Sequence, residues 1–161
     1  MAKFKITGID ANAFSKSLGE LSDGMEGIAK MCVYDGAGIV ADAVKKNINA
    51  LPERDPKGHG RHLRGATPAE KAALAEGFGV ADMRVEGGNV NTVLGFDGYD
   101  GNPTKKYPKG HAISMIARTI ESGSSWLTKT PFLKPAFNSS KAAAESAMSA
   151  RFDEEIKKRG L

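Results

Sequence analysis

Apolar residues recur every three or four positions along much of the chain, and this spacing predicts helices. Asp10 is suited to cap a short first helix that reaches a break at Gly24. A longer helix is expected from Ile28 to Leu51, where the apolar residues form a four-residue ladder that Pro52 ends. Helices therefore dominate the first part of the chain.

Three further helices are expected in the second part. Thr67-Pro68-Ala69-Glu70 joins an N-cap, a proline and a glutamate three residues on, so it predicts a capped helix that Gly77 ends. Residues 112–122 carry isoleucines on one face and stop at Gly123. The last helix is expected from about Pro135 to Arg159. Its predicted apolar stripe consists of Phe137, Ala144, Met148, Phe152 and Ile156.

Alternation with a period of two predicts strands at two places. One is residues 3–9, and the other is residues 83–96, where Gly87-Gly88 marks a hairpin turn that sets Val85 opposite Val90. The resulting order predicts an α+β fold, with a small antiparallel sheet packed against a long helix of the N-terminal half and a long C-terminal helix. A length of 161 residues suits a single domain, 1–161.

Two segments rich in glycine, proline and charged residues separate these elements. Residues 52–66 and 97–110 hold few apolar side chains, so both are predicted to be mobile loops. They also hold most of the clustered cations. These are Arg54, Lys57, Arg61 and Arg64 in the first loop, and Lys105, Lys106 and Lys109 in the second. Such clusters suit an acidic partner or DNA, although solvation alone also explains them.

Charge and composition exclude only a few classes of function. The formal net charge of +4 is too small by itself to indicate nucleic-acid binding. The single cysteine, Cys32, excludes an internal disulfide. The sequence shows neither a signal peptide nor a run of apolar residues long enough for a membrane span, so synthesis and retention in a cytoplasm are expected.

No arrangement of side chains in the sequence predicts catalysis or metal binding. His59 and His62 lie in a glycine-rich loop without preorganised ligands, and Cys32 falls on an apolar helical face. Glu121 stands near several serines but lacks the histidine that a serine hydrolase needs. We therefore expect no enzyme activity, no metal and no cofactor.

Four motifs in a fixed order carry a resemblance to a known family. They are NTVLGFDGY from Asn91, PTKKYPKG from Pro103, IARTIESG from Ile116 and PFLKPA from Pro131, and a helix rich in Ala, Glu and Lys follows them. The chain in this respect resembles the tail-completion, or head–tail joining, minor tail components of siphoviruses. Most of the chain takes part in the resemblance. The segment 52–66 departs from it, because it is expanded here and a capped helix follows it.

The resemblance implies a structural protein of the virion rather than an enzyme. Family members form a ring in the neck, which implies self-association as a cyclic homo-oligomer, with six-fold symmetry favoured over twelve-fold. The implied partners are neighbouring connector, tail-terminator or tail-tube proteins, and the end of the packaged DNA. The implied location is the neck of the virion, with no membrane contact. The alternatives are a sequence-independent DNA-binding module that uses the basic loops, and a small hydrolase built around Glu121.

Residues 126–135 raise a separate question. Pro131 and Pro135 fix the backbone on either side of Phe132, so this arm could dock on a neighbouring subunit. Phe132 could equally fill the core of its own chain. The predicted interface residues are Glu121, Gly123, Trp126, Pro131, Phe132, Leu133 and Pro135.

Overall fold

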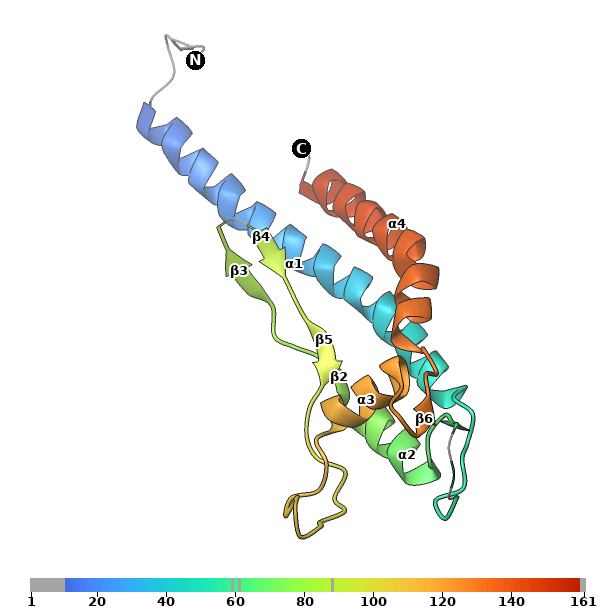
Figure 1. Cartoon of the computed structure of the whole chain (residues 1–161). Coiled ribbons are helices and arrows are strands. Elements are labelled where there is room, and N and C mark those ends of the chain that lie inside the picture. The colour runs from blue at the N-terminus through green and yellow to red at the C-terminus, as the bar shows by residue number, and fades with distance from the viewer. Residues whose placement is uncertain (1–10, 59, 61, 88, 160–161) are drawn as a thin grey trace.

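The computed structural model describes residues 11–58, 60, 62–87 and 89–159 (Figure 1). Within residues 11–23 it describes the backbone alone. The strand predicted at residues 3–9 and the predicted cap at Asp10 lie outside the described residues. The described chain is α+β, as the sequence predicts.

Two long antiparallel helices form the spine of the molecule (Figure 1). Helix α1 spans Ala11–Asn49, 39 residues, and helix α4 spans Leu133–Arg159, 27 residues. The predicted break at Gly24 is wrong, because α1 continues through it. Gly24 faces α4, and the guanidinium of Arg159 fills the space that a Cβ on Gly24 would need. The helical ladder of hydrogen bonds tolerates this glycine at a cost of about 1 kcal/mol.

The face of α4 that meets α1 consists mainly of small residues. Its buried positions are Ala136, Ser140, Ala144 and Glu155. The predicted apolar stripe is therefore wrong for its aromatic members, since Phe137 is 43% exposed and Phe152 is 41% exposed. Small side chains let the two helices approach closely. At Gly36 of α1 an added Cβ would lie 2.7 Å from Sδ of Met148, so a methyl group there would have to displace the Met148 side chain.

Two short helices close one end of the spine (Figure 1). Helix α2 spans Pro68–Gly77 and starts with the predicted capping box, in which Thr67 and Glu70 bond each other's backbone N–H groups. Helix α3 spans Ile113–Ser122 and ends at Gly123, also as predicted. The main core lies here. Its members are Ala41, Val44, Ile48, Leu51, Ala66, Leu74, Phe78, Ile113, Ala117, Ile120, Leu127, Phe132 and Ala136. We call this region the compact end.

Within the residues that the structure describes, the strands form three separate pairs rather than one sheet. The pairs are β1 (Leu63–Arg64) with β6 (Leu127–Thr128), β2 (Phe78–Val80) with β5 (Leu94–Phe96), and β3 (Arg84–Glu86) with β4 (Asn89–Asn91). The β3–β4 hairpin has the predicted register of Val85 opposite Val90. The other antiparallel pair, β2–β5, and the parallel pair, β1–β6, were not predicted.

The segment 52–66 carries more structure than a mobile loop. The backbone N–H of Arg54 donates to the carbonyl of Ala66 at 2.9 Å, and that of Ala66 donates to the carbonyl of Pro52 at 3.0 Å. Gly65 has φ +77° and lies against the backbone of Pro52, where no Cβ would fit. The two ends of the segment are thus tied together at the base. In the described part of the chain, no helix is long and apolar enough to cross a membrane.

Candidate functional site

Glu121, at the end of α3, caps the start of α4. Its carboxylate accepts hydrogen bonds from the backbone N–H groups of Phe132 (2.7 Å), Leu133 (2.8 Å) and Lys134 (3.1 Å). These groups have no partner within the helix, and a negative charge at a helix N-terminus is stabilising. Glu121 therefore has a structural role in joining the two helices.

Gly123 makes the turn that lets this junction form. It has φ +78°, and a Cβ there would lie 2.8 Å from the backbone nitrogen of Lys129 and 3.0 Å from the carbonyl oxygen of Leu127. Any other residue would be strained by both the backbone conformation and the lack of space. The path of the chain from α3 to β6 thus explains why Gly123 ends the IARTIESG motif.

Phe132 lies in the core of its own chain, with 1% of its surface exposed. Its ring meets that of Phe96 edge-on, with centroids 6.2 Å apart, and its carbonyl accepts a hydrogen bond from the Asn47 side chain at 2.9 Å. The sequence allows two alternatives for residues 126–135, docking on a neighbouring subunit and packing in the core of the same chain. The structure shows the second for Phe132. The prediction of Phe132 as an exposed docking anchor is wrong. Leu133 also packs partly against this core, whereas Pro131 and Pro135 are exposed.

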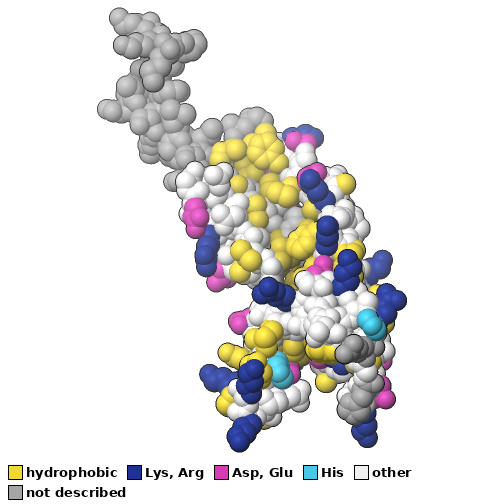
Figure 2. Space-filling model, viewed as in Figure 1, with side chains coloured by type: hydrophobic (Ala, Val, Ile, Leu, Met, Phe, Trp, Pro, Cys, Tyr) yellow, Lys and Arg dark blue, Asp and Glu magenta, His cyan; other side chains and the backbone are white. Residues whose placement is uncertain are grey.

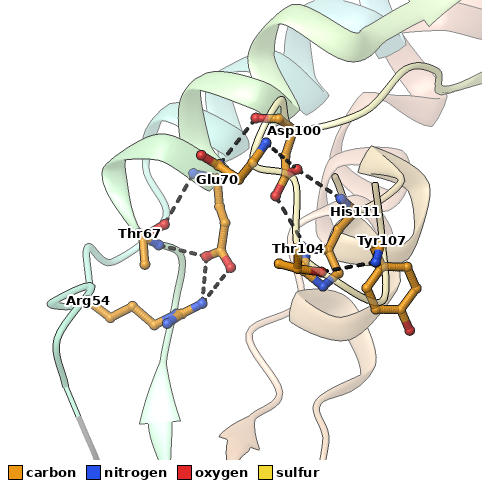
Figure 3. Close-up of polar contacts among 8 residues, drawn as sticks. Arg54, Thr67, Glu70, Asp100, Thr104, Tyr107 and His111 are labelled. Atoms are coloured by element: carbon orange, nitrogen blue, oxygen red, sulfur yellow. Dashed lines mark hydrogen bonds and ion pairs between the residues drawn. The ribbon is translucent and has the colours of Figure 1, made fainter. Parts of the chain in front are cut away.

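Arg54 is paired within the fold, and so its predicted contact with an outside anion is wrong. Its Nη2 lies 2.6 and 2.7 Å from the two carboxylate oxygens of Glu70, the residue that also caps α2 (Figure 3). The guanidinium carbon lies 5.3 Å from the ring centre of Trp126. The indole is 43% exposed, so one of its faces covers Arg54 while part of its surface remains open to solvent.

Residues 99–112 form a closed loop, which we call the lysine loop. Tyr99 and Ala112 form a β-bridge at its base, and the backbone N–H groups of Asn102 and His111 both donate to Oδ1 of Asp100, at 3.0 and 2.9 Å (Figure 3). Gly110 has φ +88°, and Asp100 occupies the space that a Cβ would need there. This part of the segment 97–110 is therefore held in shape by Asp100 and is not the structureless loop that its composition predicts.

The electrostatics of Asp100 fit this structural role. Burial of the carboxyl group alone would raise its pKa, but the hydrogen bonds from Asn102 and His111 outweigh burial and the pKa of Asp100 lies below its ordinary value. Nδ1 of His111 lies 3.5 Å from Oδ2 of the same carboxylate. Asp100 therefore remains charged at neutral pH.

The lysine loop presents its cations to solvent. Lys105, Lys106 and Lys109 are exposed, and none of them forms an ion pair with a residue in the described part of the chain. Nζ of Lys106 lies 5.4 Å from the ring centre of Tyr107, and Nζ of Lys109 lies 6.0 Å from that of Tyr99. Of the other predicted basic residues, Lys57 and Arg64 are exposed and Arg61 lies outside the described residues.

An apolar hollow of about 270 Å³ lies beside Trp126. Its apolar walls are formed by Met115, Ile116, Ile120, Trp126 and Leu127. A larger and more open depression of about 740 Å³ lies between α2 and the base of the lysine loop. The polar side chains that line the smaller hollow are Glu70, Asp100, His111 and Thr119, and the Thr119 hydroxyl donates to the carbonyl of Met115.

In the described part of the chain, the groups that the sequence offers for metal binding and nucleophilic chemistry have these surroundings. Among them there is no group of three or more His, Cys, Asp or Glu residues that could hold a metal ion. Burial raises the pKa of the Cys32 thiol, and the nearby charge of Asp35 raises it further, which disfavours the reactive thiolate. The hydroxyl of Ser124 accepts a hydrogen bond from the backbone of Leu127. It belongs to a turn rather than to a hydrolase site.

Apolar side chains remain uncovered on the spine. They include Tyr34 (66% exposed) and Met25 (36%) of α1, together with Phe137 and Phe152 of α4. Figure 2 shows hydrophobic side chains gathered over the upper half of the molecule, where α1 and α4 run side by side. Helix α4 ends opposite Gly24, so residues 11–23 of α1 extend past it (Figure 1).

The surface thus offers two regions for contact with other molecules, the apolar helical face and the lysine loop. Comparison of the chain with protein-family models, with curated proteins and with solved structures gave no match.

Proposed function

We infer that the chain is a non-enzymatic structural protein of a tailed bacteriophage, which forms a ring in the neck of the virion, completes the tail and joins it to the head. The observation that carries this proposal is the form of the spine. A helix that projects past its partner, with aromatic side chains exposed beside it, suits a subunit that is completed by contacts with other chains.

The projecting part of α1 gives the energetic argument. Helices in proteins gain most of their stability from packing of one face against other elements rather than from helix propensity alone. Residues 11–23 extend α1 beyond the end of α4. Packing against a second chain would stabilise it, and that chain would also cover exposed side chains such as Tyr34 and Phe152.

We assign the second copy of the same chain as the partner. Exposed apolar groups on both helices of one hairpin can meet those of a neighbouring hairpin in a repeating contact, and repetition of a heterologous contact closes a ring. The resemblance of the four motifs to tail-completion proteins supports this assignment. It also supports neighbouring connector and tail-tube proteins as the partners at the two faces of the ring.

Removal of the chain from the phage that encodes it tests the function. Because a neck protein is needed after heads and tails are made, we expect filled heads and complete tails that remain separate, visible by electron microscopy. Addition of the purified chain to these particles should restore joining. Normal joining without the chain would contradict the proposal.

A pair of variants tests the surface. Phe152→Glu with Tyr34→Glu places charges on the exposed apolar face and should abolish self-association in sedimentation velocity, with an unchanged thermal midpoint. Ser146→Glu adds a charge at an exposed polar position of the same helix and should leave association intact. If both proteins associate like the wild type, the helical face is not the subunit contact.

A further inference from the structure

The lysine loop has a defined backbone structure, although its sequence contains few apolar residues that could stabilise it by burial. A segment rich in glycine, proline and lysine gains little from burial, and fixing its backbone is entropically costly. Here the Asp100 carboxylate, the bridge at Tyr99 and the positive φ of Gly110 fix it. A second turn is fixed nearer the tip, where Thr104 and Tyr107 exchange backbone hydrogen bonds of 2.9 and 3.1 Å (Figure 3). The cations of the loop are thus held in a defined arrangement.

The charge of this tip is of one sign. Between Gly101 and Gly110 the chain contains three lysines and no acidic residue. Two of the ammonium groups rest near tyrosine rings instead of carboxylates, so their charge is not neutralised within the described chain. In Figure 2 the tip of one of two projections at the lower end of the molecule carries a group of basic side chains.

We propose that the lysine loop is a contact site for the phosphate backbone of duplex DNA. Lysine ammonium groups act as point charges on phosphates without demanding a fixed geometry, and DNA offers phosphates in a close and regular row. The exposed ring of Tyr99, beside Lys109, adds a polar and aromatic surface of the kind that accompanies such contacts. The contact reads no sequence, because nothing in the loop is shaped to reach base edges in a groove.

The density of charge favours DNA over an acidic protein. Duplex DNA carries about one negative charge for every 1.7 Å of its axis, so it can meet several clustered cations at once. The lysine loop contains three lysines and no arginine, so its contacts are those of point charges without bidentate geometry. The proposed DNA contact does not depend on assembly of subunits into a ring, because one lysine loop on a single subunit suffices for weak binding of DNA.

Fluorescence anisotropy of a short labelled duplex of mixed sequence tests this proposal with the full chain. Three phosphate contacts predict that the logarithm of the binding constant falls with the logarithm of salt concentration at a slope near −3, which is a loss of about 40-fold between 50 and 200 mM salt. The triple variant Lys105→Gln, Lys106→Gln, Lys109→Gln should bind at least about tenfold more weakly at low salt, and its slope should be smaller by about 3.

A matched variant separates this loop from the net charge of the protein. Lys134→Gln, Lys141→Gln, Lys157→Gln removes the same number of charges from exposed positions on α4. It should bind the duplex like the wild type. An equal loss of affinity in the two triple variants would overturn the proposal, because it would assign binding to overall charge.

Two further measurements complete the test. Gly110→Ala keeps the charge but cannot keep the closed loop, so we expect several-fold weaker binding with an unchanged circular dichroism spectrum. Binding equal to the wild type would contradict the role of the fixed arrangement. Polyglutamate in place of DNA should bind more weakly at the same salt concentration. Tighter binding of polyglutamate would overturn the assignment to DNA in favour of an acidic protein partner.

Discussion

At the compact end, α1 and α4 pack into a core shared with α2 and α3, whereas the part farther along combines small residues and a polar cluster with a few buried apolar side chains such as Ile28. In the core, Val44 and Ile48 of α1 are fully buried. In the far part, which we call the distal half (Gly24–Gly36 with Ala144–Arg159), Arg151 lies 3.7 Å from Asp35 and 3.6 Å from Glu155. The difference indicates that the compact end contributes most of the buried core, while apolar side chains such as Tyr34 and Phe152 stay exposed in the distal half, where the proposed subunit contact would cover them.

The largest effect on this comparison should come from Phe132→Ala. Removal of a fully buried ring leaves a cavity, and we expect a loss of about 3–5 kcal/mol in the free energy of unfolding. Phe137→Ala removes a phenyl ring from an exposed position of α4 and should change stability by no more than about 0.5 kcal/mol. Urea denaturation of both variants is the measurement. Equal losses would remove the distinction between the core position and the exposed one.

Two glycines of α1, at the boundary of the distal half and just beyond it, sharpen the comparison. An added Cβ at Gly36 would meet Met148, whereas at Gly38 it would meet nothing within 4 Å. Gly38→Ala should therefore stabilise the protein by about 0.5–1 kcal/mol through helix propensity. Gly36→Ala gains the same propensity but must displace the Met148 side chain, so we expect it to be less stable than Gly38→Ala by about 1 kcal/mol. Thermal unfolding that ranks the two alike would show that the helices are not in tight contact there.

The smallest effect concerns pH and the lysine loop. Because the pKa of Asp100 is lowered in the folded state, its stabilising contribution is fully present above the ordinary carboxyl pKa and is lost as pH falls through the lowered value. Hydrogen exchange of the His111 and Asn102 amides should therefore lose protection on acidification before the core amides do. In Asp100→Asn this pH-dependent step should disappear. Its persistence in that variant would assign the step to another group.

Local signals in the sequence predicted the elements whose cause is local. The capping box at Thr67 and Glu70, the hairpin register of Val85 with Val90, and the end of α3 at Gly123 each depend on residues a few positions apart. The strand pair of β2 with β5 was missed because three residues are too few to show an alternating pattern.

Other features depend on partners that are distant in the sequence. The sequence gives no sign that Glu121 caps α4, because the backbone groups that it binds lie at the start of the next helix. It also gives no sign that Arg54 is paired, because Glu70 and Trp126 approach it only in the folded chain. The buried face of α4 was mispredicted because hydrophobicity favours Phe152, whereas the close contact with α1 selects small residues such as Ser140 and Ala144. The lysines of the candidate site were predicted, but the loop structure that holds them was not.

The order in which the molecule folds follows from where its two helices are joined. The contact of α1 with α4 requires the ends of the intervening segment, near Asn49 and Leu133, to come together, which costs conformational entropy. We expect this cost to be met in one step, when β1 pairs with β6 and Glu121 binds the start of α4. From there the helices can pair turn by turn toward Gly24 without further closure. We expect the pairing to act like a zipper, whose last turns to close are the first to open under heat or mechanical load.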